Sequence, residues 1–268
     1  MEPEDSANSE LSEPIPDTSR DQGAPAVGLN LKLKELVFDG DTILTDLDLT
    51  LSPGKITCLL GPSGVGKSSI LKILASFLPP PESSFLVTTD GDPLKGRISY
   101  MDQQDLLLPW ATVLDNLLIG DRLRGDTPDT ARAMALLDQV GLTKWRDARP
   151  DALSGGMRQR VALARSLMEE APVVLMDEPF SALDAITKYH LQALAARMLA
   201  GRTVLLITHD PMEALRLGHV IHVLSGHPAR LSLPLTPAGA IPRDPSDDAL
   251  QRLYSEIMTR LAGEPVDA

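Results

Sequence analysis

The sequence predicts an α/β fold with a mostly parallel central sheet, an antiparallel β layer on its N-terminal side and an inserted helical subdomain. Two segments with alternating apolar residues come first. Short apolar runs alternate with helical segments after residue 173, and a mostly helical stretch separates these two regions. The 268 residues are 43% hydrophobic, so the chain can bury a large core.

Each predicted element follows from its own pattern. Residues 29–33 and 47–51 alternate on either side of an Asp-Gly turn signal, which predicts the antiparallel layer. The apolar run 56–60 predicts a strand buried on both faces, and 68–78 predicts a helix that three following prolines stop. The remaining predicted elements are helices at 113–119, 130–140 and 155–168 inside an insert of about 104–168, strands at 173–177, 203–208 and 219–224, and helices at 184–199 and 211–217.

Composition divides the chain further. Residues 1–24 carry seven acidic side chains against one arginine, about half of the net charge of −12, so residues 1–27 are predicted to form a disordered acidic tail. A domain at 28–225 follows. Residues 226–268 are predicted to be a Pro-rich linker and a helix whose single apolar face docks on the domain or on a partner.

The composition also limits the class of protein. A net negative charge argues against nucleic-acid binding, because that binding depends on basic side chains. No secretory signal and no apolar run of about 18 residues occurs, so we expect a soluble, cytoplasmic chain. The single cysteine, Cys58, lies in an apolar run and is expected to pack in the core.

A glycine-rich segment directly follows the strand at 56–60 and precedes a helix. It fits the pattern GxxxxGK[ST], whose backbone N–H groups cradle phosphates, so it predicts a P-loop nucleoside triphosphatase. Lys67 is expected to reach the β and γ phosphates of ATP, and the Ser68 hydroxyl suits Mg²⁺. A glycine-rich turn that matches by chance is the alternative. The matching residues are Gly61, Pro62, Ser63, Gly64, Val65, Gly66, Lys67 and Ser68.

Two carboxylates end the apolar strand at 173–177. They are expected at the carboxyl edge of a parallel sheet, where α/β proteins bind their ligands. Asp177 suits Mg²⁺ coordination, and Glu178 is placed to orient an attacking water and accept its proton. An ordinary solvated acidic pair is the alternative.

A second candidate anion site precedes the helix at 155–168. Ser154 is a natural N-cap, and Gly155 and Gly156 expose N–H groups at the helix start. The run Leu-Ser-Gly-Gly-Met-Arg-Gln-Arg resembles the signature motif of ABC ATPases. That resemblance implies ATP hydrolysis in a head-to-tail dimer, in which each signature faces the ATP bound by the partner. An ordinary capped helix is the alternative.

The resemblance to ABC ATPases extends from about residue 29 to 225 and implies further site residues. Phe38 stands where the family stacks an aromatic ring on adenine, and Gln103 matches the glutamine that touches Mg²⁺ and water. Asp184 ends the segment that matches the D-loop, and His209 matches the histidine that contacts the γ-phosphate. Phe38 as a core residue, Gln103 as a surface residue and His209 as a strand-end histidine remain the alternatives.

The departures from the family pattern are mild. Met157 replaces the usual Gln, Ser69 replaces the usual Thr beside the nucleotide, and Asp102 replaces an aromatic or aliphatic residue. None of these changes removes a catalytic group. Three histidines in 219–227 lack ligand-type companions, so a metal site there is disfavoured.

The resemblance implies the ATP-hydrolysing subunit of an ABC membrane transporter, bound to membrane-spanning permease subunits at the cytoplasmic face of the inner membrane. The segment Leu107 to Trp110 is similar to importers of nitrate, sulfonates, taurine and thiamine precursors, which work with a separate substrate-binding protein. Core packing of Leu107 and Trp110 is an equal alternative. A soluble ABC ATPase of DNA repair or translation, a P-loop kinase or GTPase, and an exporter are the other hypotheses.

Overall fold

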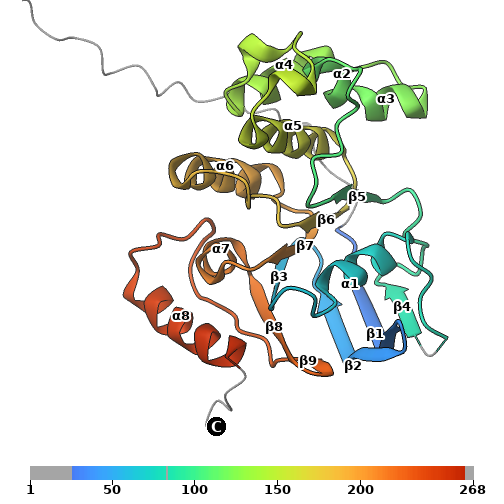
Figure 1. Cartoon of the computed structure of the whole chain (residues 1–268), viewed down its shortest axis with the longest axis vertical. Helices are drawn as coiled ribbons and strands as arrows, with labels where there is room; N and C mark the ends of the chain where they lie inside the picture. The colour runs from blue at the N-terminus through green and yellow to red at the C-terminus, as the bar shows by residue number, and fades with distance from the viewer. Residues whose placement is uncertain (1–25, 83, 263–268) are drawn as a thin grey trace, which may run out of the picture.

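The computed structural model describes residues 26–82 and 84–262. Its strands form one sheet in the order β4-β1-β2-β9-β8-β3-β7-β6-β5, seen in Figure 1. The strands are β1 (Leu29–Phe38), β2 (Asp41–Leu51), β3 (Ile56–Leu60), β4 (Ser84–Thr88), β5 (Ile98–Met101), β6 (Val173–Asp177), β7 (Thr203–Thr208), β8 (Val220–Gly226) and β9 (Ala229–Leu231).

Strand pairing confirms the predicted fold class. Neighbours from β8 through β3, β7 and β6 to β5 all run parallel, whereas β1 pairs antiparallel with β2 and β4. Asp39 and Gly40 join β1 to β2 with φ angles of 51° and 89°, as a two-residue hairpin turn requires. The strands β4, β5 and β9 were not predicted from the sequence, because each is short and lacks a clear alternation.

The parallel strands are buried on both faces, as their continuous apolar runs predict. Along β7, Val204 and Leu206 belong to one core cluster and Leu205 and Ile207 to the other, because successive side chains point to opposite faces. Cys58 of β3 is fully buried, as expected. The helices are α1 (Lys67–Leu74), α2 (Val113–Leu117), α3 (Ile119–Arg124), α4 (Thr130–Gln139), α5 (Gly155–Met168), α6 (Ala185–Met198), α7 (Pro211–Leu217) and α8 (Asp248–Leu261).

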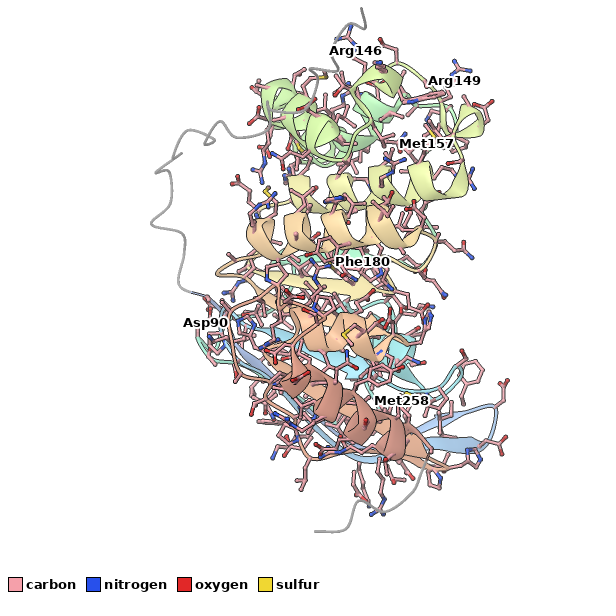
Figure 2. All side chains as sticks on the ribbon, turned by 90° about the vertical axis from the view of Figure 1, so that its left-hand side faces the viewer. Asp90, Arg146, Arg149, Met157, Phe180 and Met258 are labelled. Atoms are coloured by element: carbon pink, nitrogen blue, oxygen red, sulfur yellow. The ribbon has the colours of Figure 1, made fainter. Side chains whose placement is uncertain are left out.

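The inserted helices α2 to α5 follow β5 in the chain and precede β6. They lie at the top of Figure 1, beyond the β5 end of the sheet. The apolar faces of α2, α4 and α5 meet in one cluster with the α6 side of the sheet, so the insert shares the core of the domain. Phe180, which follows β6, is 1% exposed and lies within this core (Figure 2).

Helix α1 is shorter than predicted. Ser76 adopts a left-handed φ of 62°, and the N–H of Phe77 donates to the carbonyl of Lys72. These features form a C-terminal helix cap that ends α1 at Leu74, before the prolines that were expected to stop it.

Of the predicted acidic tail, residues 1–25 lie outside the described residues, whereas Val27 is buried in the core. Residues after 225 do not form a simple linker, because β9 joins the sheet between β2 and β8. Helix α8 docks on the domain through the buried Leu250 and Ile257, and it packs against α7 and β8. Among residues 26–82 and 84–262, no helix is long and apolar enough to cross a membrane. The domain boundaries at 28, 225 and 226 stay predictions.

Candidate functional site

The phosphate-loop motif joins β3 to α1, as its sequence context requires. Gly64 and Gly66 have φ angles of 79° and 101°, and a Cβ on Gly61 would come within 2.6 Å of a backbone oxygen. The glycines therefore permit a tight loop that a residue with a side chain would strain. The exposed N–H groups at the start of α1 complete a potential phosphate site.

Lys67 is the first residue of α1 and is 6% exposed. Its Nζ donates to the carbonyls of Gly61 and Pro62 at 2.7 and 2.8 Å. Burial lowers the pKa of Lys67, while the charges of Glu178 and Asp177 oppose that shift. The ammonium is thus poised over the loop, where a phosphate could replace the carbonyl contacts.

Asp177 and Glu178 lie at the carboxyl end of β6. The Ser68 hydroxyl acts on the Asp177 carboxylate and lowers its pKa, so a hydroxyl oxygen and a carboxylate lie near each other beside the phosphate loop. Burial raises the pKa of Asp177, and the nearby carboxylates Glu178 and Asp102 add to that rise. A bound divalent cation would reverse this shift, and these hard oxygen donors fit Mg²⁺.

Glu178 meets the two other predicted catalytic residues. Its Oε2 lies 3.0 Å from Nδ1 of His209, and Nε2 of Gln103 donates to the same oxygen at 3.4 Å. Gln103 follows β5, Glu178 follows β6 and His209 follows β7, so three adjacent parallel strands deliver the side chains to one edge. The His209 side chain is 60% exposed, whereas Glu178 is 14% exposed.

Phe38 lies at the end of β1 and is 63% exposed, so the alternative that it packs in the core is excluded. It borders a hollow of about 240 Å³ next to the phosphate loop. An exposed aromatic ring beside a phosphate site can stack on a base. The other residues that line this hollow are Ile43, Gly64, Gly66, Lys67, Ser68 and Ser69.

The start of the signature helix α5 and the segment that follows β5 line a second hollow. Ser154 caps α5 by accepting the N–H of Met157 at 3.3 Å, and Figure 2 shows Met157 at the beginning of that helix. Asp184 caps α6 in the same way by accepting the N–H of Thr187 at 3.0 Å. The hollow beside α5 shares no lining residue with the hollow at the phosphate loop. It is lined by Gln103, Gln104, Asp105, Leu106, Gly155, Arg158, Gln159 and Ala182.

Sequence reasoning missed the contacts that attach the segment after Gln103 to helix α5. Arg158 donates from Nε to the Asp105 carboxylate at 2.9 Å, and Arg165 donates to the backbone oxygens of Asp105 and Leu106 at 2.9 and 2.8 Å. Arginines at 158 and 165 of the predicted helix lie two turns apart on one face, which was the available signal. The segment and the signature helix are therefore mechanically linked.

Core packing, the alternative given for Leu107 and Trp110, holds for Leu107 only. Leu107 is 8% exposed and belongs to the core, whereas Trp110 is 70% exposed. His219, the first of the three histidines, accepts the N–H of Ile56 at 3.0 Å. In the part of the chain that the structure describes, no group of His, Cys, Asp and Glu side chains could hold a metal ion as a cluster.

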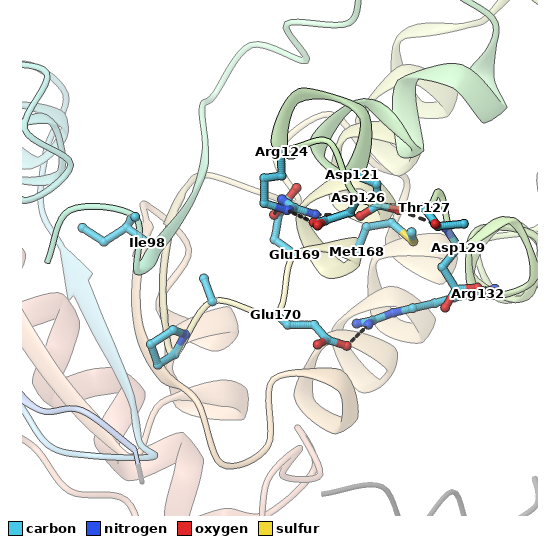
Figure 3. A pocket seen from close by; sticks show the side chains of 13 residues that line it. Ile98, Asp121, Arg124, Asp126, Thr127, Asp129, Arg132, Met168, Glu169 and Glu170 are labelled. Atoms are coloured by element: carbon cyan, nitrogen blue, oxygen red, sulfur yellow. Dashed lines mark hydrogen bonds and ion pairs between the residues drawn. The ribbon is translucent and has the colours of Figure 1, made fainter. Parts of the chain in front are cut away.

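A charged hollow of about 440 Å³ lies away from this site, between the insert and the start of β6 (Figure 3). Its two arginines are paired with carboxylates, because Arg124 contacts Asp121, Asp126 and Glu169, and Arg132 contacts Glu170. It is an ion-pair network and not part of the candidate site.

The fold and the site define a P-loop nucleoside triphosphatase. The family model described as ABC transporter matches residues 44–181. A Haemophilus influenzae protein named uncharacterized ABC transporter ATP-binding protein is 42% identical over 237 residues, covering 85% of this chain and 96% of that protein. A Rhodococcus jostii protein named aliphatic sulfonates import ATP-binding protein SsuB 1 is 46% identical over 202 residues, covering 74% and 80%. A protein of the same name from Pseudomonas savastanoi pv. phaseolicola is 39% identical over 235 residues, covering 87% and 95%.

The solved structures agree with the sequence relatives. A dimeric post-hydrolysis state of an ATP-binding cassette bound to ADP and Pi matches with a TM-score of 0.68 and 27% identity, covering 79% of this chain and all of that one. The chain belongs to the ABC transporter family, as its motifs predict. It is an ATP-binding subunit that hydrolyses ATP.

Proposed function

We propose that the chain powers an ABC importer of a small polar solute, with aliphatic sulfonates as the favoured cargo. The names of relatives 39% and 46% identical support that cargo, because both are described as importing aliphatic sulfonates. The related cargoes are nitrate, taurine and thiamine precursors. In this role the chain binds permease subunits at the cytoplasmic face of the inner membrane and receives cargo indirectly from a substrate-binding protein.

The active form in this proposal is a head-to-tail dimer of two copies. The observation that carries it is the separation of the two anion sites, since the phosphate loop and Gly155 of the signature segment line different hollows of one chain. One bound nucleotide needs only one of these two anion sites from each chain. Lys67 of one copy and Ser154, Gly155 and Gly156 of the other would grip the same γ-phosphate, and the dimeric cassettes among the solved structures support this arrangement.

The site residues have distinct roles in ATP hydrolysis. Ser68, Asp177 and Gln103 would hold Mg²⁺, which neutralises charge on the β and γ phosphates when bound. Glu178 orients the attacking water and accepts its proton, because its carboxylate lies at the strand edge and is only 14% exposed. His209, beside Glu178, contacts the γ-phosphate, and the bulk of catalysis is positioning and charge stabilisation.

The remaining proposed contacts bind the nucleotide. Phe38 stacks on adenine, and the backbone of Gly61, Pro62, Ser63, Gly64, Val65 and Gly66 with Ser69 surrounds the phosphates. Asp184 fixes the start of α6, next to the dimer contact.

Uptake of labelled ethanesulfonate by cells that lack the chain tests the cargo. The wild-type chain should restore uptake, and Glu178→Gln should not. Nitrate, taurine and thiamine-precursor uptake are measured in parallel. If cells that lack the chain lose uptake of one of these solutes but keep sulfonate uptake, the cargo is reassigned to that solute. Failure of the tagged chain to co-purify with any integral membrane protein would contradict a transporter role.

A further inference from the structure

A partly buried ion pair joins helix α6 to the start of helix α7. Lys188 of α6 lies with its Nζ 2.7 Å from Asp210 Oδ2 and 3.0 Å from Glu213 Oε2. The Glu213 side chain is 2% exposed, that of Lys188 is 22% exposed and that of Asp210 is 34% exposed, so water screens the contact with Glu213 less than the contact with Asp210. The two helices are thus connected by charge at the first turn of α7.

A second set of contacts continues the connection one turn further along both helices. Arg216 donates to Oε1 of Gln192 at 2.9 Å and to the carbonyl of Tyr189 at 3.1 Å, and its guanidinium lies 3.6 Å from the centroid of the Tyr189 ring. Gln192 in turn donates to Glu213 at 3.2 Å. Residues one turn apart on each helix therefore interlock, which restrains sliding of α7 along α6.

This connection ends directly at the proposed catalytic histidine. Asp210 follows His209, and its carboxylate caps α7 by accepting the N–H groups of Met212 and Glu213 at 2.9 and 3.3 Å. The His209 side chain is 60% exposed, so little packing holds it in place. Its position opposite Glu178 depends on the backbone that Asp210 anchors.

We propose that Lys188 is a positioning residue for ATP hydrolysis, which holds the first turn of α7 so that His209 stays opposite Glu178. Lys188 itself would touch neither ATP nor water. Helix α6 begins at Asp184, so the same ion pair connects the segment at the proposed dimer contact with His209. The inference rests on the proposed role of His209 in hydrolysis.

The electrostatics of the cluster agree with this assignment. Burial raises the pKa of Asp210, but the hydrogen bond and charge of Lys188 outweigh it and keep that pKa below its usual value. Burial likewise lowers the pKa of Lys188, and the charges of Glu213 and Asp210 outweigh burial and keep it above its usual value. Asp210 and Lys188 are therefore held as an ion pair.

Steady-state ATPase kinetics of the full chain with its permease test the assignment. Lys188→Met should lower kcat about tenfold while KM for ATP changes less than about twofold, because alignment is lost and nucleotide contacts are kept. Lys188→Arg, which keeps the charge and the reach, should restore most of kcat. Lys32→Met removes an exposed ion pair with Asp48 and should leave kcat unchanged.

Two further variants distinguish a positioning role of Lys188 from a general loss of stability and from an incorrect assignment of His209. Leu136→Ala, a buried change in α4, lowers stability without touching the cluster. If the two variants have the same melting temperature, Leu136→Ala should lower kcat far less than Lys188→Met does. In a His209→Ala background, Lys188→Met should reduce kcat no further.

Each outcome decides between the two proposals. If His209→Ala lowers kcat but Lys188→Met does not, the positioning role of Lys188 is overturned and the role of His209 stands. If His209→Ala leaves kcat unchanged, the proposed function of the histidine is wrong and the inference falls with it. Equal losses for Lys188→Met and Leu136→Ala, or additive losses with His209→Ala, would reduce Lys188 to a structural residue.

Discussion

At the scale of single residues, Glu178 combines backbone strain with a central position in the site. Its φ angle of 49° is in the left-handed region, which a glutamate rarely adopts. The backbone N–H donates to the carbonyl of Ile207 at 2.9 Å, and this bond to the next strand helps to hold the conformation. Strain of this kind persists where the surrounding structure fixes a side chain for function.

Glu178→Gln should lower ATP turnover by about a hundredfold or more, since an amide keeps the shape but cannot accept a proton from water. The variant should still bind ATP, because the phosphate-loop contacts are intact. Phosphate release and fluorescent-ATP binding measure the two effects. Normal turnover in the purified variant would contradict the role of Glu178 as the base.

Phe38→Ala should raise KM for ATP about tenfold with little change in kcat, because base stacking on an aromatic ring contributes about 1–3 kcal/mol to binding alone. Phe85→Ala is the matched control, since Phe85 is 56% exposed but does not border the phosphate-loop hollow. Equal KM values for the two variants would remove Phe38 from the nucleotide site.

At the scale of elements, the carboxyl ends of β5, β6 and β7 bring the proposed catalytic side chains together. Helix α1 ends at Leu74, two residues before the left-handed Ser76, and not at the prolines further on. The segment before α8 is held by Arg243, which is 6% exposed. Substitutions at these element ends should therefore change the free energy of unfolding and leave the nucleotide site intact.

Ser76→Gly should raise the free energy of unfolding by about 1 kcal/mol, because glycine adopts a left-handed φ without the strain that a Cβ imposes. Urea unfolding measures the change, and ATPase activity should stay at the wild-type level. A lower unfolding midpoint would show that the serine side chain contributes more than its backbone conformation costs.

Arg243→Met should lower the free energy of unfolding by about 2–4 kcal/mol, because it leaves buried carbonyls without donors. Arg243 now donates to the backbone oxygens of Ala238, Leu215, Gly218 and Pro237 at 2.6 to 2.8 Å. The exposed Arg252→Met in α8 is the control and should change stability by less than about 0.5 kcal/mol. Similar melting curves for both variants would contradict this account.

At the scale of the whole molecule, neither hollow of one chain is lined by both groups proposed to bind the γ-phosphate, namely Lys67 and the signature segment. A composite site between two copies predicts complementation that a self-contained site cannot produce. This consequence can be tested with two inactive variants of the same chain.

Lys67→Met and Ser154→Arg should each abolish ATPase activity alone. A mixture should regain activity, because a mixed dimer holds one site with an intact Lys67 from one copy and an intact Ser154 from the other. Random pairing places one such site in about half of the dimers, so about a quarter of wild-type activity is expected. Phosphate release is measured across mixing ratios, and a mixture as inactive as either variant alone would contradict the composite site.

The order of strands and helices, the phosphate loop and the strand-end carboxylates followed from local patterns in the sequence. The pattern at 56–60 predicted a strand buried on both faces, and the structure confirms it. The roles proposed for Gln103, His209 and Phe38 came from family resemblance, because a lone glutamine, histidine or phenylalanine carries no local signal of its function. Strands β4, β5 and β9 were missed because they are short and depend on their neighbours in the sheet.

The sequence by itself determined the fold class and the nucleotide chemistry and predicted most of the proposed site residues, since periodicity and motif spacing act over a few residues at a time. Only the tertiary structure decided that His209 and Gln103 meet at Glu178, that α8 docks on α7, and that Lys188 pairs with Asp210 and Glu213. These contacts join residues far apart in the chain, and their distances depend on how strands order and helices pack.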